Sequence, residues 1–308
     1  CSGINKAEKT FNSFTEKWVQ ADYSSMYEML TTDSKEYITE EDFVSRYTNI
    51  FTAINANNLS FEIDGKSIKE DDVITIPFKL NMNSITGDLS LTDYKLSLVK
   101  EDKEYKIKWD ESLIFPNMIK DDKVRVSTTQ AKRGNILDRN GKILAEDGII
   151  YSVGIYPANF NKSNIEAKVT EIANALDISE DNITTKLQAN TNPEHFIPLV
   201  DILTTDPRIN TLKNRDDDGI LLKEKIGRIY YGGEAFGRLI GYIGSITAEE
   251  LEANSAKGYN DTSLIGKAGL EQVYEDTLRG EDAAEISIER GMEKITIASK
   301  EIKNGNDI

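Results

Sequence analysis

The hydrophobic periodicity of the chain changes near residue 58, and this change limits the fold more than any other feature. Before it, apolar residues recur at helical spacing, as in Ala7, Phe11, Phe14 and Trp18. After it, four segments alternate apolar and polar residues, as strands do: 59–64, 73–82, 88–100 and 104–110. Three helices before an antiparallel meander predict an α+β domain, with the helices on one face of a curved sheet.

The part of the chain after residue 116 mixes short strands and short helices. A single helix is predicted from Ala268 to Leu278, with Gly280 just past its end. A final hairpin turns at Arg290-Gly291, and the polar tail 303–308 is predicted to be a linker. The sequence therefore predicts two domains in a chain of 308 residues.

Composition excludes several classes of function. The net charge is -16, and no dense Lys/Arg cluster is present, so nucleic-acid binding is not expected. The single histidine, His195, and the single cysteine, Cys1, argue against a metal site, and no cofactor motif is found. A chain that begins with cysteine suggests a trimmed bacterial lipoprotein, although a fragment cut at an arbitrary point is the alternative.

One short motif suggests catalysis, but the strand predicted around it argues against a catalytic role. Ser97 and Lys100 spell the S-x-x-K of acyl-serine enzymes that bind penicillin. The surrounding YKLSLVK alternates like a strand, and residues three apart on a strand point to opposite faces. An S-x-N and a K-T-G are also absent from the sequence. We therefore predict no catalytic residues in this chain; an active hydrolase using Ser97 would be labelled by penicillin.

Residues 132–148, KRGNILDRNGKILAEDG, combine charges and glycines without a nucleophile. Residues Asp138 to Gly141 predict a turn that reverses the chain. Gly134 and Gly141 permit close backbone approach and positive φ. This pattern favours a structural role.

Two further blocks follow this one in the second part of the chain. One runs from Arg228-Ile229-Tyr230 to Gly244, and the other runs from Gly266 to Gly280. Together the three blocks resemble the non-catalytic region of class B penicillin-binding proteins, except that Tyr231 replaces the family's proline and Ile240 its leucine. The residues that the resemblance implies as structural or interdomain contacts are Arg133, Gly134, Asp138, Arg139, Gly141, Arg228, Gly269, Glu271 and Tyr274.

The first part resembles the MecA-type N-terminal domain of low-affinity penicillin-binding proteins, which implies an NTF2-like fold. The implied organisation is an anchor-proximal segment (1–10), the NTF2-like domain (11–116), an elongated α+β dimerisation or pedestal domain (117–302) and a linker (303–308). The transpeptidase domain of the family, a peptidoglycan D,D-transpeptidase, is expected to be missing from this sequence. The resemblance thus implies a non-enzymatic region of a cell-wall enzyme, with a link to β-lactam resistance.

The resemblance also implies partners and a location. These are the parent's own transpeptidase domain, peptidoglycan strands and cell-wall synthesis proteins. An acylated Cys1 would hold the chain on the outer face of the bacterial cell membrane.

Two hypotheses about individual residues follow. Arg133, Arg228 and Glu271 are candidates for a partly buried ionic network that ties three separated segments together. Alternatively, the first domain is a small-molecule-binding module, with a pocket lined by Tyr23, Tyr27, Tyr47 and Trp109. The sequence favours packed core for these four, because no acid/base pair accompanies them.

Overall fold

The computed structural model describes residues 2–308, which form two compact units. The first unit runs to Ala131 and also contains Glu281–Lys303; the second comprises Lys132–Gly280 and Asn304–Ile308. Cys1, the predicted lipid anchor, lies outside the described residues. No helix within residues 2–308 combines the length and apolar character needed to cross a bilayer.

Four helices begin the first unit, one more than predicted. They are α1 (Ser2–Val19), α2 (Tyr23–Glu28), α3 (Thr32–Tyr37) and α4 (Glu40–Ala53). The prediction of α4 is confirmed at its start, where the Thr39 side chain accepts a hydrogen bond from the Asp42 amide. The additional helix α3 has few apolar residues and therefore no stripe that the sequence could reveal; its Thr31 cap holds it instead.

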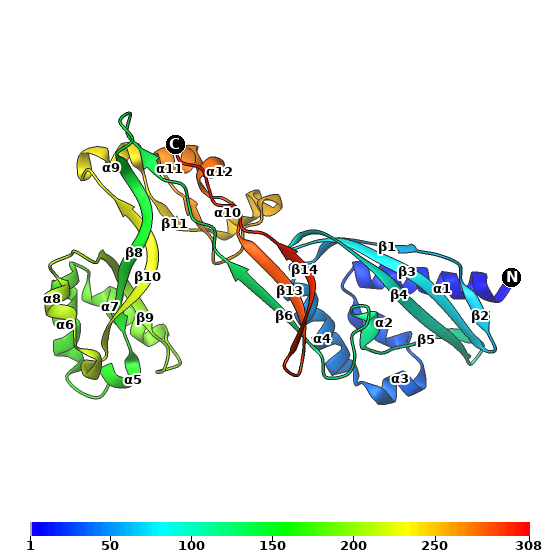
Figure 1. Cartoon of the computed structure of the whole chain (residues 1–308). Helices are drawn as coiled ribbons and strands as arrows, with labels where there is room; N and C mark the ends of the chain where they lie inside the picture. The colour runs from blue at the N-terminus through cyan, green and yellow to red at the C-terminus, as the bar shows by residue number, and fades with distance from the viewer. Residues whose placement is uncertain (1) are drawn as a thin grey trace. The chain divides into compact units, whose positions relative to one another are not determined.

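The predicted meander is present as a five-stranded antiparallel sheet in the order β1-β3-β4-β5, with β2 beside β3. Its strands are β1 (Asn57–Ile63), β2 (Ile68–Glu70), β3 (Val73–Ser84), β4 (Gly87–Glu101) and β5 (Glu104–Lys108). Figure 1 shows α1 lying along this sheet. The alternation is visible in β3, where every second side chain from Ile74 to Met82 is buried in the core.

A second sheet in the first unit joins distant parts of the sequence. It contains β6 (Lys123–Thr129), β13 (Ala283–Arg290) and β14 (Glu293–Lys300) in the order β14-β13-β6. The hairpin predicted at Arg290-Gly291 is therefore confirmed. Ile286 and Ile288 of β13 belong to the same hydrophobic core as the buried residues of α1, α2 and α4. The predicted domain boundary at residue 116 stays a prediction, because these units group residues by contact rather than by sequence order.

The second unit is built on a four-stranded antiparallel sheet in the order β10-β8-β7, with β9 also beside β8. The strands are β7 (Ile136–Leu137), β8 (Ile143–Ile155), β9 (Ile197–Leu203) and β10 (Ile220–Tyr230). Between β8 and β10 lie α5 (Pro157–Phe160), α6 (Ile165–Leu176), α7 (Glu180–Ala189), α8 (Ile209–Leu212) and a 3-10 turn, η2 (Asp216–Asp218). Most of these elements pack around one hydrophobic core that includes Phe160, Ile172 and Ile183.

The elements after β10 are short. They are α9 (Glu234–Ile240), β11 (Ile243–Ser245), α10 (Ala248–Ala253), η3 (Ser255–Lys257), β12 (Leu264–Gly266), α11 (Gly269–Val273) and α12 (Glu275–Leu278). The prediction of one helix from Ala268 to Leu278 is wrong in detail, because the backbone leaves helical geometry at Tyr274.

The tail 303–308, predicted to be a linker, makes contacts that its polar composition does not predict; its linker role stays a prediction. Residues 305–308 form backbone hydrogen bonds with Lys132, Asn135, Leu137 and Thr277. These bonds hold the tail against the second unit.

Candidate functional site

Two arginines from separate segments converge on one buried carboxylate in the second unit. Arg133 precedes β7, Arg228 lies on β10, and Glu271 lies on α11. The Nε atom of Arg133 donates to Oε2 of Glu271, and the Nε atom of Arg228 donates to Oε1, both at 2.7 Å. The structure thus brings together the three residues proposed from the sequence as an ionic network.

Each arginine also contacts a second carboxylate and a backbone carbonyl. Arg133 pairs with Glu275 at 2.7 Å and donates to the carbonyl of Glu271. Arg228 pairs with Asp147 at 3.2 Å and donates to the carbonyl of Gly134 at 2.7 Å. We call Arg133, Asp147, Arg228, Glu271 and Glu275 the ionic cluster. Because the planar guanidinium groups bind several acceptors at once, they fix the directions of the segments that carry those acceptors.

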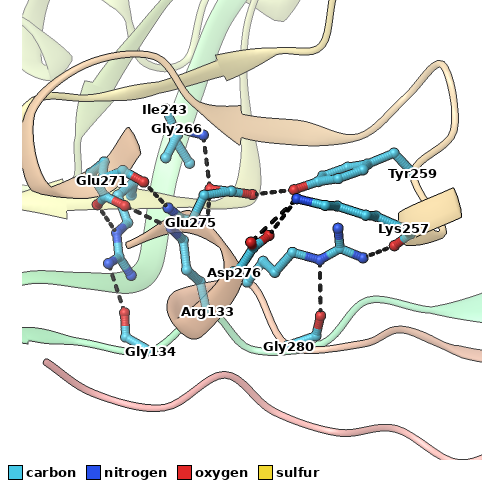
Figure 2. A network of polar contacts seen from close by, with 12 residues as sticks. Arg133, Gly134, Ile243, Lys257, Tyr259, Gly266, Glu271, Glu275, Asp276 and Gly280 are labelled. Carbon is cyan, nitrogen blue, oxygen red and sulfur yellow. Dashed lines mark hydrogen bonds and ion pairs between the residues drawn. The ribbon is translucent and has the colours of Figure 1, made fainter. Parts of the chain in front are cut away.

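Glu275 extends the ionic cluster toward the segment before β12. Its two carboxylate oxygens accept hydrogen bonds from the hydroxyl of Tyr259 at 2.8 Å and from the amide of Gly266 at 3.0 Å. Figure 2 shows Glu275 between Arg133 and Tyr259. The guanidinium of Arg279 lies over the Tyr259 ring, with its Cζ atom 3.9 Å from the ring centroid.

The side chains of the ionic cluster are largely buried. The Glu271 side chain has no exposed surface and that of Arg228 is 2% exposed, so their charges depend on each other for solvation. Burial by itself lowers the pKa of Arg133, but Glu271 and Glu275 outweigh it and the pKa is raised. Burial and the bond to Glu275 raise the pKa of Tyr259 to about 12, so this phenol stays protonated and donates.

Local sequence explains how the segments reach the ionic cluster. Asp147 is the cross-strand partner of Arg228 in the β8–β10 pair, so both side chains emerge on the same face of the sheet. Gly269 opens α11 with a φ of +58°, and an added Cβ would lie 2.4 Å from the carbonyl oxygen of Leu239. Only glycine fits this close contact, and Glu271 follows two residues later in α11.

The other predicted residues lie outside the ionic cluster. Asp138 and Gly141 form the turn between β7 and β8: Asp138 Oδ1 accepts from the Lys142 amide at 2.9 Å, and Gly141 has a φ of +78°. Arg139 is exposed at this turn, and Tyr274 is 43% exposed between α11 and α12. Their proposed interdomain role stays a prediction.

Sequence reasoning missed Asp147, Glu275 and Tyr259 as parts of the site. Asp147 becomes recognisable only when the register of β8 against β10 is known. Glu275 stands four residues after Glu271 within the third block and could have been proposed from that spacing. No signal in the sequence points to Tyr259.

The two alternative sites receive no support from the positions of their residues. Ser97 and Lys100 both lie in β4, three residues apart on an extended strand, so they point to opposite faces as predicted. The four aromatics of the proposed pocket are buried. Tyr47 accepts a hydrogen bond from the Trp109 indole at 3.0 Å, and the Tyr27 hydroxyl donates to the carbonyl of Ile38, so these polar groups are satisfied within the core. Among the side chains that the structure describes, no group of three or more His, Cys, Asp or Glu is arranged to hold a metal ion.

Two family models match the chain in sequence order. Residues 6–122 match an NTF2-like N-terminal transpeptidase domain, and residues 128–308 match a penicillin-binding protein dimerisation domain. The second match covers more than half of the chain and includes all five residues of the ionic cluster.

Individual relatives agree with these matches. Penicillin-binding protein 3 of Bacillus subtilis is 33% identical over the whole of this chain, and peptidoglycan D,D-transpeptidase MrdA of Escherichia coli is 26% identical over 65% of it. The chain spans 47% of the first relative and 31% of the second. A solved complex of PBP2 and MreC from Helicobacter pylori is a weaker match, with a TM-score of 0.40 and 20% identity over 60% of this chain and 36% of that chain.

Proposed function

The chain belongs to the penicillin-binding protein dimerisation-domain family, and from this membership we propose that it is the N-terminal, non-catalytic region of a class B penicillin-binding protein. In this role it positions a transpeptidase domain for peptidoglycan cross-linking and offers surfaces to partners. The observation that carries the proposal is the order of the two matched domains, combined with an ionic cluster assembled from all three resembling blocks.

The chemistry of the ionic cluster suits a supporting role rather than catalysis. Its carboxylates accept from arginines, a phenol or backbone amides, and its guanidinium groups are engaged by carboxylates and carbonyls. A catalytic acid or base must exchange a proton with a substrate, and buried groups paired in this way are poorly placed to do so. The same pairing gives a rigid support, because charged hydrogen bonds fix both distance and direction.

The proposal includes an anchor and a location. A lipid on Cys1 would hold the first unit at the outer face of the bacterial cell membrane, and the second unit would then carry the catalytic domain toward the peptidoglycan. Peptidoglycan strands and other cell-wall synthesis proteins are the proposed partners. Mass spectrometry of the protein from its native membrane tests the anchor: an unmodified Cys1 at a mature N-terminus would contradict it.

Labelling with a fluorescent penicillin tests whether this region is non-catalytic and the complete protein carries the transpeptidase. We expect no covalent label on the 308-residue chain, and we expect a label on the complete protein produced from the natural gene. The Ser97→Ala variant of the complete protein should be labelled as strongly as the wild type. Labelling of the 308-residue chain, or failure of the complete protein to label, would overturn the proposal.

A further inference from the structure

The tail 304–308 occupies a defined place in the second unit, between two segments of the chain. On one side, the amides of Gly305 and Ile308 donate to the carbonyls of Lys132 and Asn135, at 2.9 and 3.0 Å. On the other side, the amide of Asn306 donates to the carbonyl of Thr277 at 3.0 Å. We call residues 132–137 and 277–278 the two walls of the tail seat.

Side chains of the tail add to this backbone pairing. The Oδ1 atom of Asn304 accepts from the Lys132 amide at 3.0 Å, and Oδ1 of Asp307 accepts from the Asn135 amide at 2.7 Å. Ile308 packs against the small hydrophobic cluster that contains Ile136 and Leu278. The polar sequence of the tail is therefore used in binding.

Glycines on both partners make the close approach possible. A Cβ on Gly134 would lie 2.0 Å from the carbonyl oxygen of Asn306, and a Cβ on Gly305 would lie 1.7 Å from that of Leu278. Both contacts involve backbone atoms, which cannot move aside as the end of a side chain can. Neither glycine has a positive φ, so space rather than backbone conformation requires glycine here.

The ionic cluster holds both walls. Arg228 donates to the carbonyl of Gly134 in the first wall, and the Arg133 amide donates to Asp147. The second wall is the end of α12, which begins at Glu275, and Glu275 pairs with Arg133. The Gly134 amide also donates to the Leu278 carbonyl at 2.8 Å, which joins the walls to each other.

We propose that the tail seat is a receptor for an extended peptide, that residues 304–308 are its ligand, and that the ionic cluster fixes the two joined walls in the positions that bind this peptide. This deepens the proposed function, on which its biological meaning rests. The Ile308 amide donates to Asn135, and the Leu137 amide donates to the Ile308 carbonyl, which is the pattern of parallel strands around Ile136. A chain that continues past residue 308 would therefore leave the seat in the direction of β7, from a fixed point.

Hydrogen exchange of the full chain, measured by NMR at single amides, tests the seat. Gly305, Asn306 and Ile308 should exchange at least about tenfold more slowly than Asp307, whose amide has no acceptor within residues 2–308. Gly134→Ala should remove this difference. The matched control is Gly237→Ala, where an added Cβ meets nothing within 4 Å and the tail should stay protected. Equal exchange at all four tail amides of the wild type would overturn the proposal.

A second variant keeps the test decisive if Gly134→Ala fails to fold. Gly305→Ala changes only the ligand, and it should expose the Leu137 amide, whose acceptor is the Ile308 carbonyl. Adding a synthetic peptide of residues 303–308 in excess should then restore protection at Leu137. If the peptide restores none, the seat is not a receptor. Penicillin and cell wall play no part in this experiment, so its failure would leave the proposed function standing.

Discussion

Replacing Glu271 with glutamine removes the central charge of the ionic cluster at nearly constant volume. Both carboxylate oxygens of Glu271 accept from an arginine Nε at 2.7 Å. The amide keeps one acceptor but presents an NH2 group to the other arginine, so a charged hydrogen bond of about 1.5–3 kcal/mol is lost and two donors face each other. Because Arg133 and Arg228 keep Glu275 and Asp147, we expect a loss of about 3 kcal/mol, the lower end of the range for breaking a buried pair.

The positions of the tryptophans make the assay selective. Trp18 and Trp109, the two tryptophans of the sequence, both lie in the first unit. Tryptophan fluorescence therefore reports the unfolding of that unit, and hydrogen exchange at β8 and β10 amides reports the second unit. With a urea dependence of about 2 kcal/mol per molar, Glu271→Gln should lower the midpoint for β8 and β10 by about 1.5 M and leave the fluorescence midpoint unchanged.

Asp276→Asn is the matched control for this change. Asp276 lies on α12 next to Glu275, but its side chain is 72% exposed and pairs with the partly exposed Lys257. An exposed pair contributes little, so the control should shift the second unit by less than about 1 kcal/mol. An unchanged midpoint in Glu271→Gln, or equal shifts in the two variants, would refute the role given to the buried charge.

Three further predictions concern pH, a turn and a helix cap. The hydrogen bond from Arg290 lowers the pKa of the buried Asp122 below its ordinary value of 3.8. The ionised Asp122 therefore stabilises the first unit above pH 3.8, and this stabilisation is lost as the pH falls through the lower folded-state pKa. Asp122→Asn should flatten this acid dependence of the tryptophan fluorescence transition. Gly141→Ala, at a φ of +78°, should destabilise the second unit by about 1–2 kcal/mol in hydrogen exchange. Thr39→Ala should lower the fluorescence midpoint by an amount equivalent to about 1 kcal/mol, and Thr39→Ser should restore it.

The fold was predictable where local pattern and tertiary structure agree. The apolar stripe from Ala7 to Trp18 gives α1, and the alternation from Val73 to Met82 gives β3, because each pattern matches the period of its element. The sequence could not reveal the interruption at Tyr274. Neither proline nor glycine stands between Leu270 and Leu278 to mark the break, so this stretch of the sequence reads as one helix.

The ionic cluster was predictable only in part, for a related reason. Arg133, Arg228 and Glu271 were found through the resemblance of three blocks, whereas Asp147 and Tyr259 depend on strand register and loop path. The contacts of the tail were not predicted, because its polar composition is typical of a linker. Its binding relies on backbone hydrogen bonds and on two glycines that meet carbonyl groups, and composition does not record such contacts.

The positions of the charges in the ionic cluster match one register of β10 against β8. A hydrophobic cluster of equal volume can be as stable as a buried ion pair, but it accepts many arrangements of similar side chains. Sliding β10 by one residue against β8 would turn Arg228 to the opposite face and leave Glu271 without one of its two cations. The same slide is blocked sterically, because Gly227 faces Gly148, and a Cβ at Gly227 would lie 2.1 Å from the Ile150 side chain. Two restraints therefore favour one register, and we infer that the position of Gly134 in the tail seat depends on both, because Arg228 donates to its carbonyl.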